Sequence, residues 1–129
     1  MKIFMFILLS FLSIPIFALD DCTLASTQYE MNICLGKNLE NVELKLERKI
    51  SEISKVISNE KGISLLLESN NSWKEYRDKH CLSVSNIYEG GSLQRFIETE
   101  CKITTTEKRI ESIQNDYKDT IDIIQKGRP

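Results

Sequence analysis

The chain contains few of the residues that build metal or catalytic sites, since its 129 residues include one histidine, one tryptophan and four cysteines. No two cysteines form a CxxC pair, and the histidine, His80, directly precedes Cys81, so a metal centre is not expected. No run of lysines and arginines marks a phosphate-binding surface. The net charge of −2 permits a basic partner but is too small to select one. We therefore expect no metal, no cofactor and no nucleic acid.

Long apolar runs are also absent, with one exception near the start of the chain. Lys2 is followed by the nearly unbroken apolar run "IFMFILLSFLSIPIF", which ends at the small residue Ala18 before an acidic stretch. This layout is typical of a secretory signal peptide, and the run is shorter than the roughly 20 residues that span a bilayer. A retained membrane anchor is the alternative. We expect residues 1–18 to be removed and residues 19–129 to form one periplasmic or secreted domain with no membrane span.

Strand-like alternation is absent from the remaining chain, whereas helical periodicity is clear. A capping box formed by Thr27 and Glu30 predicts the start of a first helix. Its apolar residues recur every three or four positions, which places them on one buried stripe. They are Leu35, Leu39, Val42, Leu46, Ile50, Ile53 and Ile57. The helix should end near Ser58, with Gly62 in its C-terminal cap or in the turn after it.

A second helix is expected up to the glycines of "YEGGS", and its apolar positions predict a second buried stripe. That stripe consists of Leu66, Trp73, Tyr76 and His80, continued by Val84 and Ile87. Within it, "SWKEYRDKHC" places Trp73, Tyr76, Arg77 and His80 on one side of the helix, which we interpret as a core face. Asp78 and His80 are the alternative acid–base pair, but residues two apart on a helix point in different directions. No nucleophile turn accompanies them, so we expect no catalytic residue.

A third helix is expected to begin at a Ser92 cap and to run to Ile124, with a weak point at "ITTT", residues 103–106. β-Branched residues lose side-chain freedom in a helix, so a break and restart at this point is one alternative. Short connections make sequential helices neighbours. The predicted fold class is therefore all-α, a small antiparallel bundle of three main helices stapled by disulfides.

An even number of cysteines in a small exported chain predicts two disulfides. If "EGG" is a tight turn, Cys81 and Cys101 lie level across an antiparallel helix pair and can bridge. Cys22 can then reach Cys34 if the segment before Thr27 folds back along the first helix. The rival pairing joins Cys34 to Cys101 and Cys22 to Cys81.

Four elements occur in an order that resembles a known family. They are "C-x4-T-x2-E-M-N-x-C" at Cys22–Cys34, "W-x3-R-D-x2-C" at Trp73–Cys81, "GGS" at Gly90–Ser92, and Cys101 followed by "T-x2-R" at Thr106–Arg109. Together they resemble the small exported bacterial proteins with a lysozyme inhibitor LprI-like N-terminal domain, over essentially the whole chain after the leader.

The resemblance implies an all-helical domain outside the cytoplasm and, by analogy with the member that names the family, inhibition of a lysozyme. The matched residues are interpreted as framework. Trp73 packs in the core, Arg77 and Asp78 tie helices together, and Gly90 and Gly91 turn the chain. Arg109 is a further structural residue of the motif. A protein-interaction module of the envelope, or a secreted one, with no enzyme-blocking activity is the alternative function.

An inhibitor must fill or cover a glycosidase cleft with a rigid projecting edge. The expected edge is "NIYEGGSLQR", in which Tyr88 is the candidate anchor and Asn86, Glu89 and Ser92 are candidate polar contacts. The alternative is a glycine turn in which Tyr88 packs on its own bundle.

Overall fold

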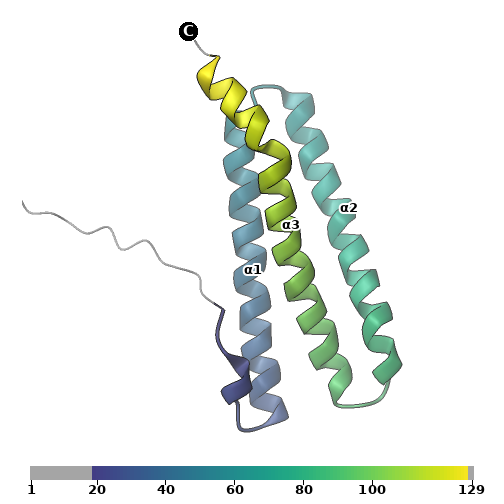
Figure 1. Ribbon diagram of the computed structural model, residues 1–129. Helices are drawn as coiled ribbons and strands as arrows, with labels where there is room; N and C mark the ends of the chain where they lie inside the picture. The colour runs from purple at the N-terminus through teal and green to yellow at the C-terminus, as the bar shows by residue number, and fades with distance from the viewer. Residues whose placement is uncertain (1–18, 128–129) are drawn as a thin grey trace, which may run out of the picture.

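The computed structural model describes residues 19–127 as an antiparallel bundle of three helices, with no strand among these residues (Figure 1). The helices are α1 (Gln28–Val56), α2 (Glu60–Ser85) and α3 (Leu93–Lys126). Two short 3-10 turns, η1 (Cys22–Leu24) and η2 (Asn86–Tyr88), precede α1 and α3. The predicted all-α bundle is confirmed, whereas the expected signal peptide, residues 1–18, lies outside the described residues.

Both predicted disulfides are present, Cys22–Cys34 and Cys81–Cys101, and the rival pairing is wrong. They lie at the end of the bundle that holds η1, the first turns of α1 and the connection from α2 to α3 (Figure 1). We call this the stapled end.

The first helix follows its sequence pattern closely. The Thr27 hydroxyl accepts a hydrogen bond from the Glu30 backbone N–H at 3.1 Å, as the capping box predicts. Most of the predicted stripe is buried, from Leu35 through Leu46 to Ile53, because helical spacing places these residues on one face. The prediction for Gly62 is wrong: the turn is Ile57 to Asn59, and Gly62 lies in the first turn of α2.

The predicted stripe of α2 is wrong for most of its length. Tyr76 is 59 % exposed, and its ring stacks on exposed His80 with centroids 5.6 Å apart. The residues of α2 that are buried are Leu66, Asn70, Arg77, Cys81 and Ser85. The Cys81–Cys101 disulfide gives the physical reason, since Cys81 must face α3 and thereby turns the Arg77 side of α2 inward. Tyr76 and His80 are then rotated to the surface.

The third helix is unbroken, so the alternative of a break at residues 103–106 is wrong. Buried Thr106 fits because its hydroxyl donates to the Lys102 carbonyl, one turn earlier in α3, at 2.6 Å. Ser92 precedes α3 but its side chain makes no capping hydrogen bond.

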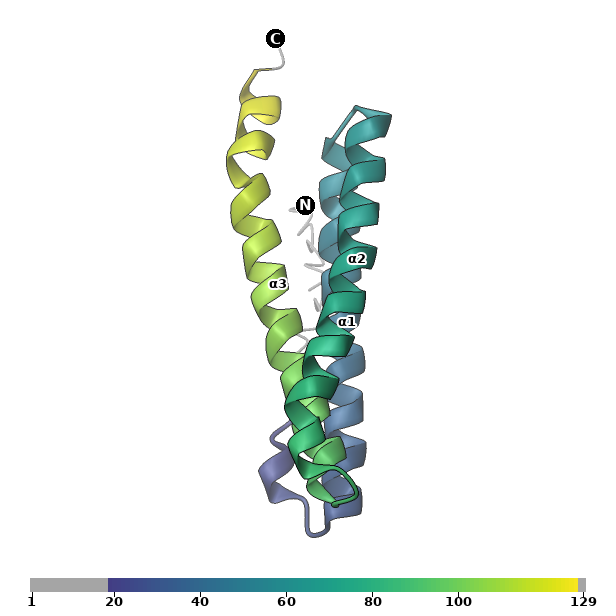
Figure 2. The ribbon, with the colours of Figure 1, turned by 90° about the vertical axis from the view of Figure 1, so that its right-hand side faces the viewer.

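α3 packs along both other helices, whereas α1 and α2 approach each other closely at few places. Figure 2 shows α3 diverging from α2 toward its C-terminus. Ile103, Ile110 and Ile113 of α3 contribute to one core with the α1 stripe and Leu66. The helix that comes last in the chain therefore holds the bundle together.

Candidate functional site

The buried residue Arg77 is the centre of a polar cluster that joins all three helices. It is 4 % exposed, and its guanidinium forms ion pairs with Glu43 of α1 at 2.8 Å and with Asp78 at 2.9 Å. It also donates to the Thr106 hydroxyl of α3 at 3.0 Å. A buried cation needs paired charges and satisfied donors, and this cluster provides them. The interpretation that Arg77 ties helices is supported, whereas Asp78 acts within α2 itself.

The Trp73 ring lies against two guanidinium groups. The central carbons of Arg77 and Arg109 are 5.4 and 5.6 Å from the ring centroid, which is cation–π geometry. The Arg109 Nε is buried without a hydrogen-bond partner. These residues belong to the framework of the bundle.

The connection from α2 to α3, which we call the tip (residues 86–92), is a compact turn at the stapled end. Gly90 has φ +76°, in the left-handed region that favours glycine. The Gly91 N–H donates to the Tyr88 carbonyl at 2.9 Å, and a Cβ on Gly91 would lie 3.2 Å from that oxygen. Both glycines therefore have the turning role that the sequence predicts.

The tip presents apolar side chains to solvent. Ile87 is 84 % exposed and Tyr88 is 42 % exposed. The predicted polar contacts, Asn86, Glu89 and Ser92, are exposed around them. A shallow hollow of about 300 Å³ is lined by residues from Ile87 to Leu93. The sequence placed Ile87 on a buried stripe, which is wrong because α2 ends at Ser85 and the chain turns away from the helical periodicity at η2.

A second surface of the stapled end surrounds the N-terminal segment, residues 19–23. The side chain of buried Asn38 accepts from the Asp20 backbone N–H at 2.8 Å and donates to the Asp20 carbonyl at 2.9 Å. The Cys22–Cys34 disulfide fixes the same segment to α1. The two attachments hold one wall of a hollow of about 400 Å³ between this segment, α1 and α3.

Asp21 begins the turn at η1, where the hydroxyl and the backbone N–H of Thr23 donate to its carboxylate at 2.6 and 3.0 Å. These two hydrogen bonds lower the pKa of Asp21 below its usual value, the hydroxyl having the larger effect. The lowered pKa keeps Asp21 ionised to a lower pH than an ordinary aspartate.

Within residues 19–127, no cluster of histidine, cysteine and carboxylate side chains could hold a metal ion. In the same part of the chain, no helix has the length and apolarity needed to cross a membrane.

The family model for lysozyme inhibitor LprI matches residues 20–112, most of the chain. The chain belongs to the lysozyme inhibitor LprI family. No curated protein and no solved structure matches it. The LprI match extends from the N-terminal segment through the tip and most of α3, so it contains both disulfides, the Arg77 cluster and both surfaces of the stapled end.

The LprI motif residues therefore fall into two groups in space. Trp73, Arg77 and Arg109 lie together between helices, whereas Gly90 and Gly91 form the tip. The motifs locate the framework of this LprI chain, but they do not include Ile87, and of the residues that line the apolar part of the N-terminal hollow they include only Met31 and Cys22. The sequence signal for the tip is the end of helical periodicity before two glycines.

Proposed function

We propose that this LprI-family chain binds a lysozyme and slows its hydrolysis of cell-wall glycan, without catalysing a reaction itself. Membership of the lysozyme inhibitor family is the observation that carries the proposal. Two disulfides are typical of proteins that fold outside the cytoplasm, where lysozymes act. We infer a periplasmic or secreted protein whose signal peptide, residues 1–18, directs export and is then removed by cleavage.

The proposed mechanism is occlusion by the tip. A glycosidase cleaves its substrate between two carboxyl groups in a cleft, so a blocking protein has to fill that cleft or cover its mouth. Ile87 and Tyr88 provide exposed apolar area on a turn that directly follows the disulfide-bonded segment of α2. An apolar anchor surrounded by polar contacts is the usual arrangement of an interface hot spot. We extend the anchor from Tyr88, the candidate in the sequence, to include Ile87.

The direct test uses the oxidised protein, residues 19–129, in molar excess over several lysozymes that clear a cell-wall suspension. We expect slower clearing and a complex in calorimetry. If no lysozyme is slowed and no complex forms at tens of micromolar, a limit of about −6 kcal/mol, inhibition is wrong for those enzymes. A complex without slower clearing supports the interaction module instead.

The role of the tip is tested with Ile87→Ser, because the Ile87 side chain is 84 % exposed. We expect the dissociation constant for the inhibited lysozyme to rise about tenfold, or about 1.4 kcal/mol. The matched control is Leu65→Ser, because Leu65 is 55 % exposed and lies near the start of α2, at the opposite end of the bundle. Equal affinities for the two variants would place the contact surface elsewhere.

A further inference from the structure

The hollow beside the N-terminal segment combines an apolar floor with a rim of one charge sign. Its floor is formed by buried Leu35 and Ile103 and by half-buried Met31 and Phe96. Its volume of about 400 Å³ lies within the range of small ligand pockets, so it has room for a long side chain and part of its neighbour.

The rim is acidic. Exposed carboxylic residues lie on two sides of the hollow, two on the N-terminal segment and two on α3. They are Asp20, Asp21, Glu100 and Glu107. No lysine or arginine lines this hollow, which we call the acid-rimmed hollow. Lys45 lines a separate space of about 30 Å³ that shares Glu107 with it. A low-dielectric floor under several carboxylates favours a cationic group.

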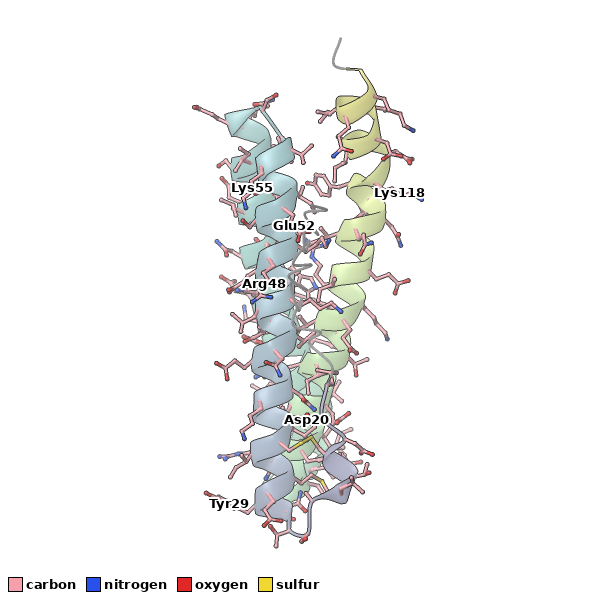
Figure 3. The ribbon with its side chains drawn as sticks, turned by 90° about the vertical axis from the view of Figure 1, so that its left-hand side faces the viewer. Asp20, Tyr29, Arg48, Glu52, Lys55 and Lys118 are labelled. Carbon is pink, nitrogen blue, oxygen red and sulfur yellow. A yellow bond between two sulfur atoms is a disulfide. The ribbon has the colours of Figure 1, made fainter. Side chains whose placement is uncertain are left out.

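The hollow is preformed by its covalent and hydrogen-bonded wall. Asn38 pairs with both backbone groups of Asp20, and the Cys22–Cys34 disulfide holds the rest of the segment on α1. Figure 3 shows Asp20 beside the yellow disulfide, where the segment passes between α1 and α3. A site that is already ordered loses less conformational entropy when a partner binds.

A second hollow between α1 and α3 differs from the first in the charges on its rim. That hollow, of about 460 Å³, lies between α1 and α3 near the opposite end, and Figure 3 shows Glu52 and Lys118 on the two helices. Lys49 and Asp122 also line it, so both charge signs are present on its rim. The rim of this hollow therefore favours neither a cationic nor an anionic group, whereas the rim of the acid-rimmed hollow favours a cationic one.

We propose that the acid-rimmed hollow receives an arginine side chain from a basic segment of the bound lysozyme. The methylene groups of the arginine would lie on the floor, with the Phe96 ring available to the guanidinium, while the rim carboxylates accept its hydrogen bonds. This inference rests on the proposed function for the identity of the partner. Leu93 lines the shallow hollow at the tip, and Phe96 lines the acid-rimmed hollow. The first turn of α3 therefore connects the two surfaces, and one partner can cover both.

The first experiment is calorimetry of the inhibited lysozyme with the double variant Glu100→Gln/Glu107→Gln, at several salt concentrations. Both side chains are exposed, so the fold is retained. We expect the dissociation constant to rise about tenfold and its salt dependence to become shallower. The control is Glu40→Gln/Glu75→Gln, which removes the same charge from exposed positions that do not line the hollow. Equal effects of the two double variants would overturn the proposal.

The second experiment needs no lysozyme. Butylguanidinium and its neutral analogue butylurea are titrated into the isolated protein, and backbone amide shifts are recorded by NMR. We expect saturable shifts of Asp20, Phe96 and Ile103 with butylguanidinium only. Shifts that are equal for the two probes, or spread over the surface, would overturn the proposal.

The two experiments separate this inference from the proposed function. If lysozyme is inhibited but the Glu100/Glu107 variant behaves like its control, the tip acts alone and the hollow is not a contact. If no lysozyme binds but butylguanidinium occupies the hollow, inhibition is wrong and the cation site stands. Self-association of the protein that the Glu100/Glu107 variant abolishes would identify a second copy as the occupant, which also overturns the proposal.

Discussion

At the scale of single residues, Arg77 shows how a charged side chain can be placed in the centre of a small bundle. Its partners are Glu43 of α1, Asp78 of α2 and Thr106 of α3. The side chains of Glu43 and Asp78 are 35 % and 52 % exposed. The carboxylates are therefore still hydrated while the guanidinium is buried. This arrangement reduces the desolvation cost that usually cancels the benefit of a buried ion pair.

The residue-scale prediction concerns Arg77→Ala and Arg77→Met. Alanine leaves a void beside Trp73 and removes the partner of Glu43, so we expect the free energy of unfolding to fall by about 2 to 4 kcal/mol. Methionine refills the space, and the exposed carboxylates can bind water, so we expect a loss of about 1 kcal/mol. The measurement is urea unfolding of the oxidised protein.

The control for this pair is Lys79→Ala, an exposed position on α2, with an expected change within about 0.5 kcal/mol. If the free energy of unfolding of Arg77→Ala equals that of this control, the Arg77 cluster contributes nothing to folding stability.

At the scale of elements, α3 continues through a β-branched run because tertiary contacts outweigh propensity. Ile103 and Thr106 face the bundle interior, and Thr106 both donates within α3 and accepts from Arg77. The propensity cost of such residues is a few tenths of a kcal/mol each, which is small beside burial and hydrogen bonding.

The element-scale prediction compares two neighbouring threonines. Thr104→Ala replaces an exposed residue with a better helix former, so we expect a gain of about 0.3 to 0.6 kcal/mol. Thr106→Ala has the same propensity gain but removes the acceptor of Arg77 and leaves a small void, so we expect a net loss of about 1 to 2 kcal/mol. Thermal unfolding by circular dichroism provides the comparison, and stabilisation of both variants would contradict it.

At the scale of the whole molecule, both disulfides lie at the end that carries the tip and the acid-rimmed hollow. Cys81–Cys101 joins two of the three helices, whereas Cys22–Cys34 attaches a terminal segment to α1. The first therefore stabilises the bundle, and the second mainly holds the wall of a surface.

The molecule-scale prediction is a difference between the two bridges. Cys81→Ala/Cys101→Ala opens a loop of about 20 residues inside the bundle and should lower the free energy of unfolding by roughly 3 kcal/mol. Cys22→Ala/Cys34→Ala should cost about 1 to 2 kcal/mol, because residues 19–25 can detach while the helices stay packed. Hydrogen exchange at the Asp20 amide should accelerate strongly only in the second variant. If the Asp20 amide exchanges at the same rate in Cys22→Ala/Cys34→Ala as in the unchanged protein, Asn38 holds the segment without the disulfide.

The sequence by itself determined the helical class, the start of α1 and the turning glycines, and it favoured the Cys81–Cys101 pair. These follow from local spacing: a capping box, a stripe of constant period, and two cysteines placed level on either side of a turn. The Cys22–Cys34 pair depended on a fold-back of the segment before α1, and the structure decided it against the rival pairing. Only the tertiary structure decided which face of α2 is buried. Few apolar residues mark that face, and Arg77 is buried there because Glu43 and Thr106 reach it from other helices. The acidic rim was also decided in three dimensions, because its carboxylates come from segments that are distant in the chain. The exposure of Ile87 follows from the end of α2 at Ser85 and the turn at η2.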